Sequence, residues 1–176
     1  MQSRTPADTG RAGAASELPL SAELAAAVSG ARRRAARDGD RQADTAHLLH
    51  TLLEADPETR GAFHDGPAQV ARLLGYLVQR TIGYGLRWSD AVEDSVTPPG
   101  PAGAGVPGWS HAAAGAMRNA RDRARSRGAG RVEGLDLLAA LLRDPRCRAV
   151  DVLRRAGVDT AALAAGLAWH TCQECR

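Results

Sequence analysis

One cluster of residues of the kinds that bind metal ions lies at the C-terminal end of the sequence. His170, Cys172 and Cys175 form a His-x-Cys-x-x-Cys pattern, and imidazole and thiolate groups are preferred ligands of zinc. A structural zinc site takes four ligands, so Cys147 or His111 would have to complete it. An inert or redox-labile tail is the favoured alternative, and we expect no metal and no other cofactor.

The remaining residues that could take part in catalysis form no recognisable catalytic set. The histidines at 47, 50, 64 and 111 are scattered, and none lies in a His-Glu-x-x-His motif. No Gly-x-Ser-x-Gly turn is present to expose a nucleophilic serine. Cys147 follows a proline and an arginine, which could lower the pKa of its thiol, but nothing in the sequence marks it as a nucleophile. We therefore expect a protein that is not an enzyme.

Basic side chains are concentrated in two stretches, for which two interpretations remain open. All 23 basic residues are arginine, and the net charge is +3. The clustered arginines are Arg32, Arg33, Arg34 and Arg37, then Arg118, Arg121, Arg123, Arg125 and Arg127. They would suit the phosphates of a nucleic acid. A solvated helix face is the favoured reading, because acids such as Asp38, Asp40 and Asp122 are interleaved and no stacking aromatics accompany the arginines.

The composition predicts an all-α protein. Apolar residues make up 44% of the chain but aromatics only 3%, and alanine and arginine are strong helix formers. No apolar run approaches the roughly 20 residues of a membrane-spanning helix. The polar stretch from Met1 to Glu17 lacks the apolar core of a signal peptide. These features predict a cytoplasmic protein without a membrane partner.

Proline and glycine divide the chain into two halves. Four prolines and four glycines between Val96 and Gly108 exclude a regular element there and predict a linker. Just before it, residues 88–94 form an acidic, partly apolar segment that suits either a short contact motif or an edge helix. The predicted segments are a disordered leader at 1–19, a first unit at 20–95, the linker at 96–108, a second unit at 109–169 and a tail at 170–176.

The two halves resemble each other, which indicates an internal duplication. When the chain is shifted by 89 residues, Leu20 overlies Trp109 and the match continues without a gap to Leu53 and Leu142. Gly39 meets Gly128, and four leucines fall in register. An arginine- and alanine-rich composition does not explain that register.

Each half reads as four helices. Ser21 and Ser110 stand where an N-cap is needed, Gly39 and Gly128 suit left-handed helix ends, and Thr45 is the expected cap of a second helix. The expected helices run from 21 to about 37, over 45–53, 58–64 and 67–81, then from 110 to 127, over 135–142, 146–156 and 160–169. Eight helices in two units are therefore expected.

This pattern resembles the Clp repeat domain at the N-terminus of Clp-type AAA+ unfoldases. Trp109-Ser110, and more weakly Leu20-Ser21, match the aromatic and hydroxyl pair that opens a repeat. The stretch 44–49 (Asp-Thr-Ala-His-Leu-Leu) is similar to the start of the second helix, and 152–159 (Val-Leu-Arg-Arg-Ala-Gly-Val-Asp) is similar to the closing step. The resemblance implies two tandem four-helix repeats related by a pseudo-twofold axis.

The resemblance also implies a binding role. In this family the domain docks adaptors and substrates, and in some members phosphorylated arginine or cyclic-peptide antibiotics, while separate ATPase modules supply the motor. A chain without lysine cannot contain the Gly-Lys-Ser/Thr loop of such a motor. The expected role is that of a stand-alone adaptor, decoy or sequestering protein in Clp-dependent proteolysis. Its expected partners are Clp-system proteins, adaptors, substrates or cyclic peptides; an arginine-rich nucleic-acid-associated regulator is the alternative.

The resemblance places the candidate binding groove at the seam between the repeats, beside Leu20, Ser21, Trp109 and Ser110. The family acid that recognises phosphoarginine is replaced here by Ala46 and Leu135, which accept no hydrogen bond through their side chains. Asp44, Glu133 and Asp136 are the candidate substitutes, although they project from other faces of the helix. We therefore expect phosphoarginine binding to be lost.

Overall fold

The computed structural model describes residues 18–81, 93 and 108–173 and confirms the all-α prediction. Eight helices and two very short strands make up the described part. In chain order they are α1 (Ala22–Asp38), β1 (Gln42–Ala43), α2 (Thr45–Ala55), α3 (Pro57–Gly61), α4 (Gly66–Thr81), β2 (Gly108–Trp109), α5 (His111–Ser126), α6 (Gly134–Leu142), α7 (Arg148–Arg155) and α8 (Thr160–Gln173).

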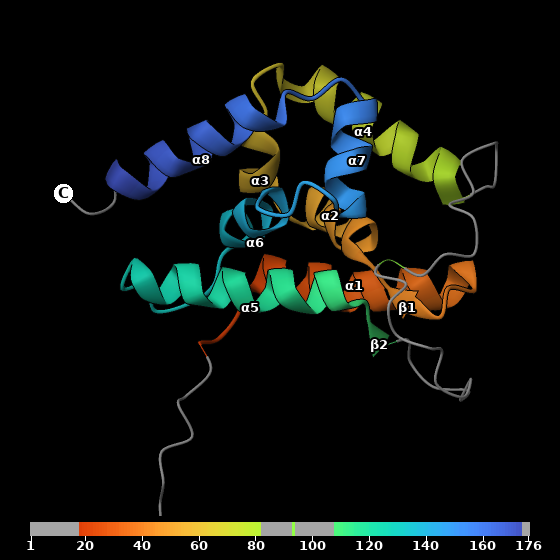
Figure 1. Ribbon diagram of the computed structural model, residues 1–176, viewed down its shortest axis with the longest axis horizontal. Helices are drawn as coiled ribbons and strands as arrows, with labels where there is room; N and C mark the ends of the chain where they lie inside the picture. The colour runs from red at the N-terminus through yellow and green to blue at the C-terminus, as the bar shows by residue number, and fades with distance from the viewer. Residues whose placement is uncertain (1–17, 82–92, 94–107, 174–176) are drawn as a thin grey trace, which may run out of the picture.

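The helices form two four-helix units arranged about a pseudo-twofold axis (Figure 1). The long first helices, α1 and α5, lie at the bottom of the view, with α2 and α6 above them at the centre. The last helices, α4 and α8, slope away from the top in opposite directions. α1 packs on α2, α5 packs on α6, and α2 also packs on α5, α6 and α7 of the other unit. The repeats therefore share one core.

The first helix of each repeat begins and ends as the sequence predicts. Ser21 accepts a hydrogen bond from the Leu24 amide (3.1 Å), and Ser110 accepts one from the Ala113 amide (3.1 Å). Gly39 and Gly128 lie just beyond these helices with φ of 75° and 70°, a conformation that costs glycine little.

Small residues let the first two helices of each repeat pack closely. The buried face of α1 consists of Leu24, Ala27, Ala31 and Ala35, spaced three or four apart, and Ala113, Ala116, Ala120 and Ala124 lie on the buried face of α5. The leucines of α2 and α6 are buried in the core that the repeats share, at 48, 49, 52 and 53 and at 137, 138 and 141. Burying each leucine contributes about 1.5–3 kcal/mol.

Two local predictions need correction. The N-cap of α2 is Asp44, which accepts from the His47 amide at 2.9 Å, so Thr45 is the first helical residue and not the cap. Aspartate and threonine are both good caps, and the sequence leaves the choice between adjacent residues open. α8 continues to Gln173, four residues beyond the expected end at Trp169.

Some predicted segments fall largely outside the described residues. Of the leader at 1–19 only Leu18 and Pro19 are described, and of the linker at 96–108 only Gly108. In the segment at 88–94 only Glu93 is described, so neither interpretation of that segment can be compared with the structure. Within the described ranges, no helix is both long and apolar enough to span a membrane.

Candidate functional site

The residues that open the two repeats lie in reciprocal parallel pairings between the repeats. Leu20 pairs with Val132, and Trp109 pairs with Ala43. The Ser21 amide donates to the Val132 carbonyl (2.9 Å), and the Ser110 amide donates to the Ala43 carbonyl (2.9 Å). Both members of the second pair are 89 positions from their counterparts in the first. The start of each repeat is thus fixed to the entrance of the second helix of the other repeat.

The four predicted groove residues divide into two pairs. Ser21 and Ser110 are 3% and 0% exposed, and their hydroxyls are occupied as N-caps. Leu20 and Trp109 are partly buried against the core. The Arg32 guanidinium lies 4.9 Å from the centre of the Trp109 ring, so a cation–π contact joins α1 to the second repeat. Leu20 and Trp109 are therefore available to a partner only in part, and the groove beside them stays a prediction.

Asp44, the first candidate acidic contact, is held by groups of the protein itself. Its carboxylate accepts from the Arg148 guanidinium at 2.7 Å and lies 2.7 Å from Nδ1 of His47. Nε2 of His47 is in turn 3.1 Å from Asp40 and 3.9 Å from Asp38. Burial raises the pKa of the Asp38 carboxyl, although His47 opposes that shift. Asp44 therefore ties α2 to α7 across the repeats.

Asp136, the second acidic candidate, is 1% exposed and paired with two arginines of α5 and its C-terminal end. Arg127 donates to both carboxylate oxygens (3.1 and 2.7 Å), and Nε of Arg123 lies 3.4 Å away. The Glu133 amide also donates to Asp136 (3.0 Å). Glu133, the third candidate, pairs with Arg131 at 2.5 Å and is the most exposed of the three. The prediction that phosphoarginine is not bound fits this internal use of Asp44 and Asp136.

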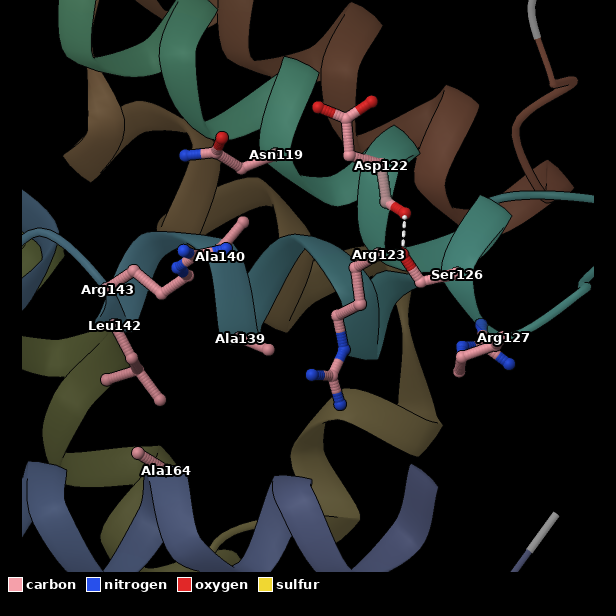
Figure 2. A pocket seen from close by; sticks show the side chains of 10 residues that line it. All are labelled: Asn119, Asp122, Arg123, Ser126, Arg127, Ala139, Ala140, Leu142, Arg143 and Ala164. Atoms are coloured by element: carbon pink, nitrogen blue, oxygen red, sulfur yellow. Dashed lines mark hydrogen bonds between the residues drawn. The ribbon is translucent and has the colours of Figure 1, made fainter. Parts of the chain in front are cut away.

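A cavity lies elsewhere, between α5, α6 and α8. It has a volume of about 450 Å³, with Ala139, Ala140, Leu142 and Ala164 among the residues that line it. Figure 2 shows Arg123 reaching from α5 into the space between α6 and α8, where it donates to the Leu167 carbonyl at 2.9 Å. The other polar lining residues are Asn119, Asp122, Ser126, Arg127 and Arg143. The cavity thus joins an apolar wall to a predominantly basic rim.

The clustered arginines are largely engaged by the protein's own side chains. Arg34 donates to both carboxylate oxygens of Glu54 at 2.8 Å. Arg125 pairs with Asp122 at 2.9 Å. Three further arginines of the clusters are engaged as described above: Arg32 contacts Trp109, and Arg123 and Arg127 pair with Asp136. This pattern matches the interleaved helix faces that the sequence favours over a phosphate-binding stripe.

Neither the metal nor the nucleophile candidates gain support from the described residues. The side chains of His170 and Cys172, and all of Cys175, lie outside the described part, which itself contains no group of three residues able to hold a metal ion. Cys147 is 2% exposed, and burial raises the pKa of its thiol to about 11. A thiol of that pKa is protonated near neutral pH and is a poor nucleophile.

The sequence pointed neither to the cavity nor to two residues that join the repeats, the buried Glu93 and the partly buried Arg148. The contact of Arg148 with Asp44 joins residues 104 positions apart, and no local pattern signals such a pairing. Leu142 and Ala164 come from helices of the second repeat that the sequence did predict. The sequence did not show that these two residues would line the same cavity.

Comparison with known proteins finds a family model that matches the second repeat and solved structures with a similar fold. Residues 109–171 match the family model of the Clp repeat (R) N-terminal domain. The fold is similar to that of the N-terminal domain of the caseinolytic protease associated chaperone ClpD from Arabidopsis thaliana, with 17% identity and a TM-score of 0.63, covering 90% of this chain and 97% of that one. The Hsp104 N-terminal domain from Candida albicans is also similar, with 13% identity and a TM-score of 0.58, covering 85% and 89%.

Comparison with curated protein sequences gives no match. The likeness to the two solved domains is therefore one of fold, at low sequence identity. It extends over both repeats, whereas the family model covers the second. Residues 109–171 thus match the Clp repeat (R) N-terminal domain, and the fold is similar to that of solved Clp N-terminal domains over up to 90% of the chain.

Proposed function

We propose that the protein is a non-catalytic docking module that binds a peptide segment of a protein partner in the cavity between α5, α6 and α8. The observation that carries this proposal is the cavity itself, which lies within the second Clp repeat. Its volume of about 450 Å³ is in the range of sites that take small ligands or a few side chains. The fold supports the same role, because Clp N-terminal domains dock substrates and adaptors in the family that the sequence resembles.

The lining of the cavity selects the chemistry of the bound segment. The side chains of Ala139, Leu142 and Ala164 offer an apolar wall for aliphatic groups. The rim carries three arginines and one acid. Arg123 and Arg127 already pair with Asp136, and Asp122 pairs with Arg125, so Arg143 is the rim charge on which the selection of a partner rests. Arg143 is exposed at the end of α6. An aliphatic segment that carries a carboxylate complements both surfaces.

The groups around the cavity support binding rather than catalysis. No histidine or cysteine is among the described residues that line it. The Ser126 hydroxyl donates to the Asp122 carbonyl at 2.9 Å, as the dashed line in Figure 2 marks. A serine needs an adjacent base to become a nucleophile. We propose that the protein acts as an adaptor, decoy or sequestering protein in Clp-dependent proteolysis, competing for substrates, adaptors or inhibitors of an unfoldase.

Reversing the charge of Arg143 is expected to weaken the binding of an acidic, aliphatic peptide by about tenfold or more. Loss of one charge-assisted hydrogen bond costs about 1.5–3 kcal/mol, and tenfold in affinity is about 1.4 kcal/mol. Fluorescence polarisation with a labelled Leu/Ala/Glu peptide measures the effect in Arg143→Glu. Arg146→Glu is the matched control. It makes the same change of charge, and Arg146 is exposed but is not among the residues that line the cavity.

Two further peptides and a nucleic acid separate the proposal from its alternatives. The peptide is made again with glutamine and with lysine in place of glutamate, and both are expected to bind more weakly. Equal binding of all three peptides, or equal loss in both arginine variants, would contradict docking in this cavity. Tight binding of single-stranded DNA that falls steeply with salt concentration would instead favour the nucleic-acid regulator.

A further inference from the structure

The place of the cavity is filled in the first repeat by the protein's own side chains. The shift of 89 positions that relates the repeats carries Ala139 onto His50 and Arg143 onto Glu54. His50 is 2% exposed, and its Nε2 atom lies 3.3 Å from Oε1 of Glu54. Arg34 donates to both oxygens of the same carboxylate at 2.8 Å. The first repeat therefore has an imidazole and a carboxylate where the second has two of the residues that line the cavity.

A second pair of differences opens the same space. Thr51 corresponds to Ala140, and Gly30 corresponds to Asn119. A Cβ added at Gly30 would lie 3.2 Å from Cγ2 of Thr51, so side chains already fill this region between α1 and α2. In the second repeat the smaller Ala140 faces a longer side chain, and both residues line the cavity. The cavity of about 450 Å³ thus lies where alanines replace a histidine and a threonine.

The charges differ between the two places as well. In the first repeat the carboxylate of Glu54 completes an ion pair. Arg143 has that position in the second repeat, and no acid among the described residues pairs with it. Arg123 already lies 3.4 Å from Asp136. Figure 2 shows the guanidinium groups of Arg123 and Arg143 on either side of Ala139. The second repeat therefore has the cation and the space but lacks the carboxylate.

We infer that the cavity seats an acidic side chain of the partner, in the place that Glu54 takes in the first repeat. Arg143 selects the carboxylate, and Ala139 and Ala140 leave room for the methylene groups that carry it. The first repeat is closed to the same partner because His50 and Glu54 fill its matching place.

This inference rests on the proposed function and adds which part of the partner is bound. Glu54 is a side chain within α2 and not a chain end, so its counterpart from a partner is the side chain of an internal segment. Since only the second repeat has the seat, one partner segment binds to each chain.

Calorimetric titration with an end-blocked peptide tests the source of the carboxylate. Acetylation and amidation leave the glutamate side chains of the Leu/Ala/Glu peptide as its only carboxylates. We expect this peptide to bind the wild type with a stoichiometry of one per chain. A second peptide has glutamine in place of glutamate and a free C-terminal carboxylate. It is expected to bind at least about tenfold more weakly.

Filling the seat in Ala139→His tests its location. The substitution gives the second repeat the histidine of the first and leaves Arg143 in place. At about pH 8, where an ordinary imidazole is neutral, the end-blocked peptide is expected to bind at least about tenfold more weakly. Ala36→His is the matched control, because Ala36 is exposed on α1 and does not line the cavity. Circular dichroism checks the folding, and Ala139→Gln, with a more flexible side chain, replaces Ala139→His if that variant is unfolded.

The outcomes separate this inference from the proposed function. Binding that is lost in Arg143→Glu but unchanged in Ala139→His would overturn the seat and leave docking at the rim. Equal binding of the glutamine peptide would show that a chain end serves as well as a side chain, which also overturns the inference. Two peptides per wild-type chain would mean that His50 and Glu54 do not close the first repeat. If neither peptide bound the wild type, both the inference and the proposed function would be wrong.

Discussion

Replacing Asp136 by asparagine is expected to lower the free energy of unfolding by about 3 kcal/mol or more. The carboxylate is 1% exposed and accepts from Arg127 through both of its oxygens. The amide of asparagine offers one acceptor oxygen and no charge, so Arg127 and Arg123 would lose their counter-ion in a site largely closed to water. Removing one partner of a buried ion pair typically costs about 3–5 kcal/mol.

Urea denaturation followed by circular dichroism measures this change. Asp122→Asn is the matched control, because Asp122 also pairs with an arginine of the second repeat but its side chain is 69% exposed. An exposed pair contributes about 0.5 kcal/mol or less. If Asp136→Asn were as stable as the control, the Arg127–Asp136 pair would not be structural. Asp136 would then again be a candidate for contact with a ligand.

Replacing Gly134 by alanine is expected to destabilise the protein by about 2–4 kcal/mol. The added methyl group would lie 1.8 Å from Asp56 Oδ2 and 2.7 Å from the Thr59 hydroxyl. Asp56 is 4% exposed and caps α3 through the Glu58 amide, so it has little room to move. Overpacking costs about 1–3 kcal/mol, and loss of an N-cap costs about 1 kcal/mol.

The control for this substitution is another helical glycine. At Gly75 in α4 an added methyl group would meet no atom within 4 Å. Gly75→Ala should therefore stabilise the protein by about 0.5–1 kcal/mol, the usual gain in helix propensity. Both variants are compared by urea denaturation. A neutral Gly134→Ala would contradict the close packing of α3 against α6.

The regular parts of the fold were accessible from the sequence because they depend on local rules. Ser21 and Ser110 are good N-caps wherever a helix starts, and Gly39 and Gly128 adopt the left-handed conformation that helix ends need. The leucine register between the halves indicated the duplication before any contact was known. The capping signals act within a few residues and the repeat shows in the sequence itself, so both can be recognised without the tertiary structure.

The pairings between repeats were not accessible in the same way. β1 and β2 have two residues each, too few to show the alternation that identifies a strand. Glu93 binds Thr45, 48 positions earlier, and the Arg148 amide, 55 positions later. The sequence around an ionisable residue outside the apolar pattern does not show whether its side chain will be exposed to solvent or buried at a junction of helices.

The candidate site shows the same division. The sequence located the repeat seam, but it assigned to ligand contact several residues that the structure uses internally. Ser21 and Ser110 cap helices, and Asp44 and Asp136 hold arginines. A carboxylate in the first turn of a helix is a good ligand contact and an equally good partner for an arginine. Only the position of Arg148 or Arg127 in space decides between these two roles.

The central claim is that a partner segment docks between α5, α6 and α8, and amide NMR spectra of the labelled protein test it most directly. The probe is the acidic Leu/Ala/Glu peptide, titrated into the wild type. We expect the largest shift changes at lining residues of the cavity, such as Asn119, Ala139 and Ala164, and expect Arg143→Glu to remove them. Changes confined to the surroundings of Leu20 and Trp109 would return the site to the repeat seam. No change at saturating peptide would contradict the docking function itself.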